Sequence, residues 1–502
     1  MNGERRSSLW RNHNYMVLWS GQAISQLGSG IQGIAFPLLV LYLTRSAADA
    51  GIAGALYSLP YLVFSLPAGV LVDRWNRKHV MMVCDTIRAL NAASIPLCAA
   101  FWHLAVLQLF LNSFIEGTMF VFFSLAQLAG LPRVVPREQL PAASAQNQAS
   151  MSAVSLIAPS VGGFIYQTLG RTAPFLVNAV SYATSVLSLH LINAEFQKER
   201  VGSQRNLWPE MKEGLSWLWN EPVARFTTLL TAGINVTAAP MGLILIVRAR
   251  ELHASPELIG AMLAIGSVGG LFGALLAPRL RQRLGFRHVM ILTVWSQALA
   301  VLLFAIAPTA VVLGVISAAL GVAGPLYNTV TMGYRLAMTP DQLQGRVNSA
   351  ARMLAFSPIP LGNAIAGALL AALGAIPVIL IFAAFRLVVA LLATVASRMD
   401  WFPSSRQLLD DRTLKVAGNQ GKDAKTDPLD AVTAPPPEVA AVATRLKQLT
   451  MDERLVLRRR FAFDGGHYGT LDDVASELRL SKDGVKQIEL SALRKLTLVS
   501  SA

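Results

Sequence analysis

The side chain best placed for chemistry is Glu116, an acid in the middle of a long apolar run. Gln108 and Asn112 precede it at intervals of four residues, so in a helix the three side chains share one face. An ionisable group inside a bilayer costs free energy unless it is paired or functional. We therefore expect Glu116 to load and release a proton or another cation. The alternative is a structural partnership with Arg88 or another base, although Asp85 and Arg88 are also spaced to pair with each other.

Polar stripes at helical spacing occur in three other apolar runs. They are Gln22 and Gln26 with Ser29 and Gly33; Thr228 and Thr231 with Asn235; and Asn328 with Thr331. Such stripes either line a polar cavity or hydrogen-bond one helix to another. An equally polar stripe in a fourth run, formed by Asn178, Ser181, Ser185 and Ser188, keeps the second alternative open.

The composition indicates that a membrane surrounds most of these residues. The 502 residues are 53% hydrophobic and 14% charged, whereas soluble domains are about 25% charged. The net charge is +14, and nearly all of its excess lies before Asp400. The excess of basic residues therefore does not indicate a nucleic-acid-binding protein. Charged residues become denser after Asp400, which predicts a membrane body followed by a soluble tail.

Twelve apolar runs have the roughly 17–25 residues that a membrane-spanning helix needs. They are 15–43, 47–72, 79–101, 104–128, 143–169, 174–192, 226–247, 258–277, 288–307, 310–334, 349–373 and 376–396. The longest loop divides them six and six. We expect an all-α fold, a twelve-helix transmembrane bundle of two six-helix halves plus a small soluble helix-turn-helix domain. The predicted parts are an N-terminus 1–14, a first half 15–193, a loop 194–225, a second half 226–397, a linker 398–437 and a domain 438–502.

Loop charges predict the orientation of the bundle. Most loop Arg and Lys residues fall on the ends that share a side with the termini, and the opposite ends carry Arg45, Arg171, Arg248 and Arg250. The positive-inside rule then places both termini in the cytoplasm of a bacterial inner membrane. In the central loop, apolar residues at helical spacing predict an amphipathic helix on the inner membrane face: Trp208, Met211, Leu215 and Leu218.

Sequence motifs resemble those of the major facilitator superfamily. The loop Gly69-Val-Leu-Val-Asp73-Arg74-Trp-Asn-Arg77-Lys78 resembles the family's G-x-x-x-D-[RK]-x-G-[RK]-[RK] motif, with Asn76 in place of its glycine. Pro159-Ser-Val-Gly162-Gly163 resembles the end of the drug-antiporter motif in span five, with Ala158 in place of a glycine. Asp85-Thr-Ile-Arg88 and Gly345-Arg346-Val-Asn-Ser349 resemble the macrolide- and siderophore-exporter branch.

The resemblance implies roles for particular residues. Spans one, four, seven and ten line the central cavity in this superfamily, so Gln22, Gln26, Gln108, Asn112, Glu116, Asn235 and Asn328 would face substrate. Gly69, Asp73, Arg74, Arg77 and Lys78 would form a gate, with Asp73 latching onto a neighbouring helix N-terminus. A plain positively charged loop explains the basic residues equally well, but not Asp73. Pro159, Gly162 and Gly163 would bend span five and allow close packing.

The tail has the spacing of a helix-turn-helix. Hydroxyl residues that can cap helices begin three of its helical patterns: Thr450, Thr470 and Ser481. In the last helix the apolar stripe is Val485, Ile488, Ala492 and Leu496. The stretch 455–496 closely resembles region 4 of sigma-70-type factors, which reads the −35 promoter element and docks on RNA polymerase. The resemblance implies that Lys482, Lys486 and Gln487 contact DNA. A generic interaction domain and a degenerate fusion remain as alternatives.

These observations predict a secondary active transporter that exports a small amphiphile of the drug, macrolide or siderophore type in exchange for protons. The alternative is a membrane-tethered transcriptional regulator whose transporter body is a ligand receptor. The sequence has no nucleotide-binding or metal-ligand pattern, so we expect no cofactor, no metal and no enzyme activity. The expected partners are the substrate, protons, lipid and, through the tail, promoter DNA or polymerase.

Overall fold

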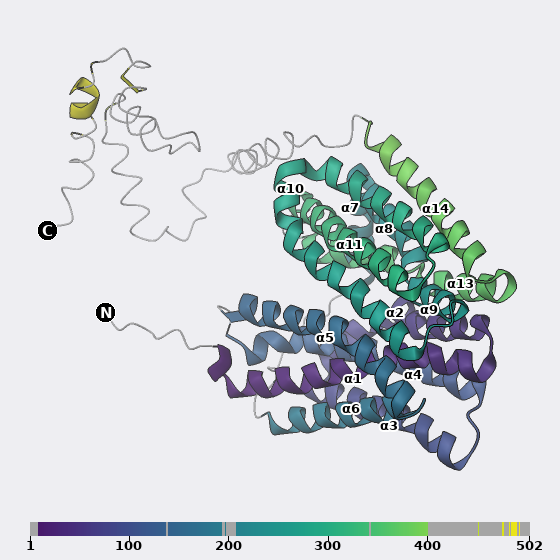
Figure 1. The fold of residues 1–502 in the computed structure, drawn as a ribbon. Helices are drawn as coiled ribbons and strands as arrows, with labels where there is room; N and C mark the ends of the chain where they lie inside the picture. Colours follow the sequence, from purple (N-terminus) through teal and green to yellow (C-terminus); the bar gives the residue numbers. More distant parts are fainter. Residues whose placement is uncertain are drawn as a thin grey trace. The chain divides into compact units, whose positions relative to one another are not determined.

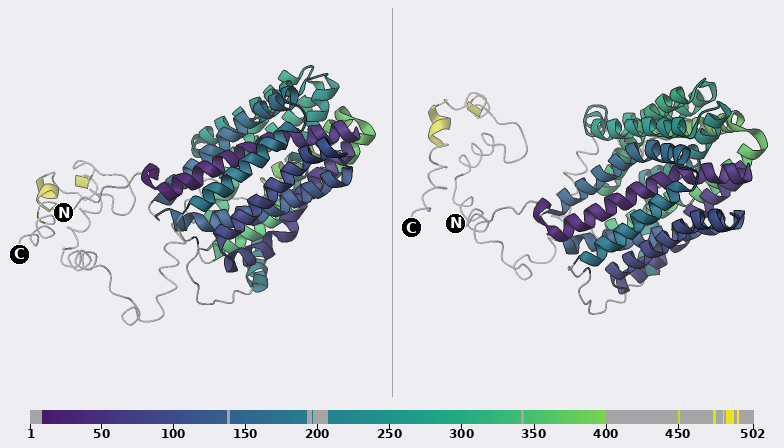
Figure 2. Two further views of the ribbon diagram at one scale, coloured as in Figure 1. Left: turned by 90° about the horizontal axis from the view of Figure 1, so that it is seen from below. Right: turned by 60° about the horizontal axis from the view of Figure 1, so that its bottom comes forward.

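A computed structural model gives the fold of residues 9–136, 139–192, 196, 207–340 and 343–399, and of residues 450, 474–475, 481, 483–488 and 491 in the tail. The described residues form helices and no strand. The chain divides into two units, Met1–Asp410 and Asp411–Ala502. Figures 1 and 2 show the long helices of the first unit running beside one another.

The helices of the first unit match the predicted apolar runs. They are α1 (His13–Thr44), α2 (Ala47–Arg74), α3 (Arg77–Phe101), α4 (Val106–Val134), α5 (Leu140–Thr168), α6 (Ala173–Leu191), α7 (Leu207–Asn220), α8 (Pro222–Ala238), α9 (Met241–Glu251), α10 (Pro256–Ile306), α11 (Ala310–Met338), α12 (Gln344–Phe356), α13 (Ile359–Leu373) and α14 (Ala375–Ala396), preceded by the short η1 (Leu9–Arg11). They supply eleven candidate spans by length and hydropathy, so the protein is a multi-pass membrane protein. The predicted run 174–192 corresponds to α6, whose 19 residues are not among the eleven.

Two of the predicted spans are each built from two helices. The span Pro222–Glu251 consists of α8 and α9, which separate at Pro240. The span Gln344–Leu373 consists of α12 and α13, which separate at Pro358. Proline has no N–H to donate to the preceding turn, which accounts for both interruptions. In α10 the break between two spans is at Gly285, where φ is 70° and glycine alone avoids strain.

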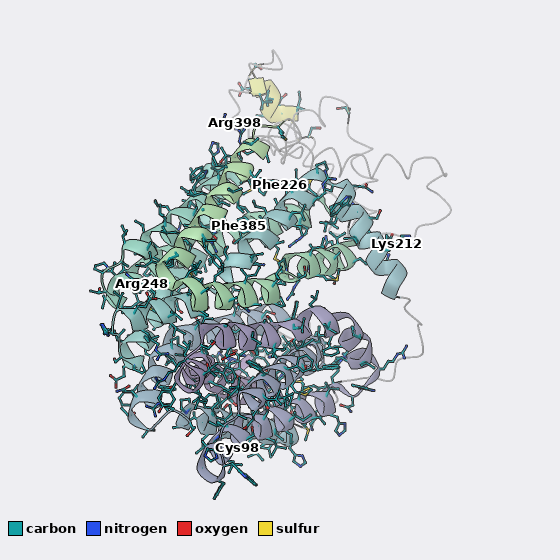
Figure 3. All side chains as sticks on the ribbon, turned by 90° about the vertical axis from the view of Figure 1, so that its right-hand side faces the viewer. Cys98, Lys212, Phe226, Arg248, Phe385 and Arg398 are labelled. Atoms are coloured by element: carbon teal, nitrogen blue, oxygen red, sulfur yellow. The ribbon has the colours of Figure 1, made fainter. Side chains whose placement is uncertain are left out.

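The two halves, α1–α6 and α8–α14, are joined at one end of the bundle. One continuous apolar cluster there contains residues from both halves, including Leu38, Ala53, Ile244, Ile259 and Ala366. The other two large clusters each belong to a single half. In Figure 1 the halves lie together near α2, α9 and α13 and separate toward the end of the bundle at which α1 begins. Figure 3 shows them as two layers, with Cys98 in one and Phe226, Phe385 and Arg398 in the other.

Glycines allow the halves to approach closely at the joined end. A Cβ on Gly51 of α2 would lie 2.5 Å from the Cα of Gly367 of α13. Likewise, a Cβ on Gly163 of α5 would overlap the carbonyl oxygen of Pro256 at the start of α10. Larger residues would therefore force these helices apart.

The central loop contains the predicted helix, α7 (Leu207–Asn220), and Leu218 of its predicted apolar stripe contacts protein. Leu218 is fully buried with Ala224 and with Val347 and Ala351 of α12. Glu213 of α7 forms an ion pair with Arg346 of α12. The side chains of Trp208 and Met211 lie outside the described residues. The expectation of a helix resting on the membrane face is thus modified at Leu218, which packs against α12.

The described part of the tail is consistent with a small helical core. The Oγ atom of Ser481 accepts a hydrogen bond from the N–H of Gly484 at 3.1 Å, and residues 483–488 are helical. Val485 is fully buried with Val474 and Ala475, and Ile488 packs beside them. The predicted cap at Ser481 and the predicted apolar stripe at Val485 and Ile488 are therefore confirmed. Thr470, Lys482, Ala492, Leu496 and the linker after residue 399 lie outside the described residues.

Candidate functional site

A cavity of about 1010 Å³ lies between the two halves of the membrane body. Its walls come mainly from α1, α2, α4 and α5 on one side and from α9, α10, α12 and α13 on the other. Four of the predicted site residues line it: Gln22, Gln26, Asn112 and Glu116. Aromatic side chains, including Phe36, Phe120 and Phe123, provide apolar surface. A cavity of this composition suits an amphiphilic small molecule.

Glu116 belongs to a buried cluster of charged and phenolic groups. Its Oε1 atom accepts hydrogen bonds from Nε and Nη2 of Arg88, at 2.9 and 2.8 Å, and from the hydroxyl of Tyr182 at 2.6 Å. Nη1 of Arg88 lies 3.3 Å from Oδ1 of Asp85. The guanidinium also lies 4.2 Å from the centre of the Tyr182 ring. One guanidinium thus joins two carboxylates, and both pairings proposed from the sequence occur together.

The cluster connects four helices. Asp85 and Arg88 come from α3, Glu116 from α4 and Tyr182 from α6, and the Tyr182 hydroxyl lies 2.9 Å from Oγ of Ser29 on α1. Asp85, Arg88 and Glu116 are at most 7% exposed. Sequence reasoning did not single out Tyr182, although it is four residues after Asn178 and three before Ser185 and so shares the face of the polar stripe of α6. Nothing local marks a tyrosine as the partner of an acid on another helix.

The other oxygen of Glu116 has a different environment. Oε2 is buried and has no hydrogen-bond partner among the described residues, and the same holds for Oδ1 of Asn112. The amide nitrogen of Asn112 donates to the carbonyl of Asn91 at 2.8 Å, and the Asn91 amide donates to the carbonyl of Asn112 at 3.0 Å. This reciprocal pair fixes the Asn112 side chain, so its oxygen remains as an unused acceptor beside the cavity.

Three other predicted site residues lie outside the cavity lining. Gln108 donates to the carbonyl of Ser94 on α3 at 3.4 Å. Asn235 on α8 donates to the carbonyl of Ala355 on α12 at 2.8 Å. Asn328 on α11 is exposed. The first two join helices, so their role in transport stays a prediction, as does that of Asn328.

The cavity also has polar lining residues that sequence reasoning missed. Nη2 of Arg352 on α12 donates to the hydroxyl of Tyr61 on α2 at 3.2 Å. The amide of Asn363 on α13 donates to the carbonyl of Gly54 on α2 at 3.1 Å. Both contacts connect the two halves. Their only sequence signal is a polar residue in an apolar run, and a single sequence does not reveal which half it contacts.

The residues of the predicted gate lie at the junction of α2 and α3. The N–H groups of Lys78 and His79 donate to the Asn76 side chain at 3.0 and 3.3 Å, so this asparagine caps α3. Nη1 of Arg77 donates to the carbonyl of Ala129 on α4 at 2.9 Å, and Nζ of Lys78 to that of Ile192 after α6 at 2.7 Å. Gly69 and the exposed Arg74 lie on α2. The Asp73 side chain is outside the described residues, so its latch stays a prediction.

The span-five motif lies where α5 crosses α1 and α10. A Cβ on Gly162 would lie 2.9 Å from the carbonyl oxygen of Ile31 on α1. Gly163 faces the first turn of α10, and Pro159 contacts Gly260 there through its carbonyl. The motif therefore lies at the contact between the two halves.

In the tail, two of the three predicted DNA-contacting residues are described. Lys486 and Gln487 are exposed on the helix 483–488, opposite the buried Val485. Lys482 lies outside the described residues. Over the described part of the whole chain, no group of His, Cys, Asp and Glu side chains could hold a metal ion.

Comparisons with known proteins agree with this architecture. The chain is 28% identical over 359 residues to the multidrug efflux pump Tap of Mycolicibacterium fortuitum, covering 69% of this chain and 87% of that protein. It is 29% identical over 205 residues to macrolide efflux protein A of Streptococcus pyogenes, covering 41% and 51%.

Solved structures share the fold at low sequence identity. The nucleoside transporter NupG aligns with a TM-score of 0.62 and 16% identity over 77% of this chain and 100% of that chain. A bacterial homologue of the iron transporter ferroportin, in an inward-facing state, aligns with a TM-score of 0.63 and 18% identity over 78% and 100%.

Two family models match the chain. Residues 445–497 match sigma-70, region 4. Residues 7–415 match the transmembrane secretion effector model. Since that match spans most of the chain, the protein belongs to the transmembrane secretion effectors of the major facilitator superfamily and carries a sigma-70 region 4 domain in its C-terminal region.

Proposed function

We propose that this protein exports small amphiphilic compounds in exchange for protons, with Glu116 as the proton-carrying group. The observation that carries the proposal is the buried cluster in the cavity wall. Two carboxylates share the single guanidinium of Arg88, and the Oε2 atom of Glu116 is unpaired within the described structure. The efflux direction is supported by the relatives named as multidrug and macrolide efflux pumps.

Proton loading at Oε2 would change the charge of the cluster without dismantling it. With both carboxylates ionised, Asp85, Arg88 and Glu116 together carry one excess negative charge. A proton on Oε2 neutralises that excess and leaves Arg88 paired with Asp85 at 3.3 Å. An uncompensated charge is costly in a low-dielectric interior. The cluster with both carboxylates ionised therefore favours contact with water, and the cluster with a protonated Glu116 favours burial. Coupling then needs a conformational change that exposes the cluster first to one side and then to the other.

The arrangement of the halves supports such a cycle. They are joined at the end where α1 and α5 finish and α10 begins, and the cavity extends from there toward the other end of the bundle. If the positive-inside rule holds, this other end faces the cytoplasm, and the cavity would receive substrate from the inner side. Opening the glycine contacts between α2 and α13 and between α5 and α10 would release it outside.

The test is transport by the purified full-length protein in proteoliposomes. We expect a fluorescent amphiphile to move when a pH gradient is imposed, and no gradient-driven movement with Glu116→Gln. The matched control is Glu257→Gln, which removes an exposed carboxylate from the first turn of α10. Gradient-driven movement by Glu116→Gln at the wild-type rate across pH 6–8 would remove Glu116 from the mechanism.

A second function is favoured by the sigma-70 region 4 match and by the helix 483–488. We propose that the tail contacts promoter DNA or RNA polymerase, and that ligand binding to the membrane body could be reported through it. The two functions separate experimentally. An exporter moves substrate after its tail is removed, whereas a pure receptor binds ligand without moving it.

A further inference from the structure

Two amide side chains with unused hydrogen-bonding atoms share the cavity face of α1. Gln22 and Gln26 are four residues apart, so their Cβ atoms lie about 5–6 Å apart on one face of the helix. Both residues line the cavity. Nε2 of Gln22 and Oε1 of Gln26 are buried, and neither has a partner among the described residues. Neighbouring side chains on this face therefore offer one unused donor and one unused acceptor.

A contact with α4 leaves the donor of Gln22 unused. The amide of Gln127 on α4 donates to Oε1 of Gln22, so the Nε2 group is the side of the Gln22 amide that remains. Gln22 is only 5% exposed, so bulk water has little access to it. Buried donors and acceptors are rarely left unpaired, because each forfeits the hydrogen bonds that it makes in water. The two glutamines therefore match a ligand that supplies both an acceptor and a donor.

The composition of α1 favours an uncharged ligand group at these two atoms. From Tyr15 to Thr44 the helix contains no acidic, basic or histidine residue. An uncharged group whose carbonyl carbon also carries an N–H is an amide, either open or closed into a lactam. Its oxygen can accept from Gln22 while its N–H donates to Gln26, as one amide side chain pairs with another.

The same face of α1 continues into open space that can hold the rest of the ligand. Gly33 lies seven residues beyond Gln26, about 10 Å along the helix and on the same face. It lines the cavity, and a Cβ there would meet nothing within 4 Å. Phe36, in the next turn, adds aromatic surface to the lining. An apolar body can therefore lie against the helix backbone while its polar end reaches the two glutamines.

We propose that Gln22 and Gln26 form a subsite for an uncharged amide group, and that the exported compounds include amides and lactams with an apolar body. The inference rests on the proposed export function and deepens it by naming a substrate class. The subsite uses no charged residue, so the substrate and the proton on Glu116 do not compete for the same atoms.

The test uses three uncharged probes with the same fluorescent aromatic body and end groups of nearly equal size. One ends in a primary carboxamide, the second in a methyl ketone, which keeps the acceptor alone, and the third in a 1-hydroxyethyl group, which has both functions on one oxygen. Binding to the full-length protein in lipid nanodiscs is measured at pH 7, and binding to empty nanodiscs is subtracted. Movement is followed in proteoliposomes under a pH gradient.

We expect the carboxamide to bind about tenfold more tightly than the ketone, since a site that hydrogen-bonds an N–H rejects an analogue without it. The alcohol should also bind more weakly than the carboxamide, because one oxygen has to serve two side chains that arise from different turns of α1.

Variants assign the preference to the subsite. Gln26→Leu should abolish the preference for the carboxamide over the ketone, because it removes the acceptor of the N–H. Gln22→Met should weaken the carboxamide and the ketone alike, because it removes the donor to the carbonyl. Gly33→Leu fills the space of the apolar body and should weaken all three probes without changing their order. The matched control is Gln167→Leu, since Gln167 is an exposed glutamine of α5 outside the cavity lining.

Each outcome has a definite meaning once thermal unfolding shows that the variants fold. Equal affinity for the carboxamide and the ketone overturns the inference, as does equal affinity for the carboxamide and the alcohol or a preference that survives Gln26→Leu. If all three probes are transported equally well, export stands and the amide subsite falls. If carboxamide-selective binding occurs without gradient-driven movement, the subsite stands and the export proposal falls. Failure of all three probes to bind overturns the subsite.

Discussion

At the scale of single residues, Arg88 determines how the charged cluster is balanced. It lies between Asp85 and Glu116, donates to both and is 4% exposed. Removing one partner of a buried ion pair costs more stability than the intact pair contributes, because the remaining charge stays buried without compensation. The guanidinium is the only partner shared by both acids in the described structure. Its loss is therefore more serious than the loss of either acid.

We expect Arg88→Met to destabilise the protein by about 3–5 kcal/mol, whereas Glu116→Gln should cost about 1–2 kcal/mol. In Glu116→Gln, Arg88 keeps Asp85, and the new amide oxygen can still accept from Tyr182. Thermal unfolding of both variants in detergent measures the difference. Equal melting temperatures would show that Arg88 does not hold the cluster together. The double variant Arg88→Met/Glu116→Gln should regain part of the loss, because it removes one of the two uncompensated acids.

The sequence predicts part of this cluster and misses the rest for a physical reason. An acid in an apolar run identifies Glu116, and a spacing of three residues identifies the Asp85–Arg88 pair, because both signals are local to one helix. Tyr182, Asn91 and Arg352 contact residues on other helices, and a single sequence contains no information on which helix faces overlap. The same limit explains why Gln108 and Asn235, polar and suitably spaced, join helices and do not line the cavity.

At the scale of elements, hydropathy predicts the spans well because the bilayer imposes one length and one composition. It does not predict the breaks at Pro240 and Pro358, since proline is common within membrane helices and α1 continues through Pro37. It also does not predict that α7 packs against α12, because an amphipathic pattern has the same form whether lipid or protein covers its apolar face. Element boundaries therefore need tertiary information.

The glycine contact between α2 and α13 gives a prediction at this scale. Gly367→Val adds atoms where a Cβ alone would lie 2.6 Å from the Cα of Gly51. We expect the joined end to open and transport to fall at least tenfold, while the protein remains folded. The measurement is thiol labelling of a cysteine introduced at Ala53, in a chain lacking Cys84 and Cys98, and labelling should become faster. The control is Gly324→Val on α11, where a Cβ would meet nothing within 4 Å and which lies outside the cavity lining. Unchanged labelling and transport in Gly367→Val would contradict a sealing role for this contact.

The cap of α3 gives a second prediction for an element. Asn76 stands where the superfamily motif has glycine, and it accepts two backbone hydrogen bonds at the start of the helix. Asn76→Ala should therefore destabilise the protein by about 1 kcal/mol, and Asn76→Gly by only a few tenths, because glycine is tolerated at this position. Melting temperatures of the two variants provide the comparison. A larger loss for glycine than for alanine would show that the side chain does not act as a cap.

At the scale of the whole molecule, the protein joins two units with different chemistry. The membrane body has its own apolar clusters, and the described part of the tail has a separate small cluster around Val485. If the body alone performs transport, a chain ending at residue 400 should retain at least half of the proteoliposome activity. Loss of transport on truncation, with the body still folded by thermal unfolding, would instead favour a tail that regulates the transporter.

The tail should contact DNA weakly, and through few residues. Lys486 and Gln487 are exposed on its described helix, and the whole stretch after residue 400 has nearly balanced charge. Because phosphate contacts supply much of the affinity for DNA, we expect little binding without a partner. RNA polymerase would supply that partner if the tail acts as region 4 domains do.

We therefore predict that the full-length protein in nanodiscs binds a −35-type duplex at physiological salt only when polymerase is present. Lys482→Ala/Lys486→Ala should weaken that binding about tenfold, since each lost phosphate or base contact is worth about 1 kcal/mol or more. Electrophoretic mobility and fluorescence anisotropy measure it, and a chain ending at residue 400 serves as the control. If the full-length protein and the double variant are equally inert with and without polymerase, the tail does not read DNA. Its buried core and exposed helix face would then point to a protein partner.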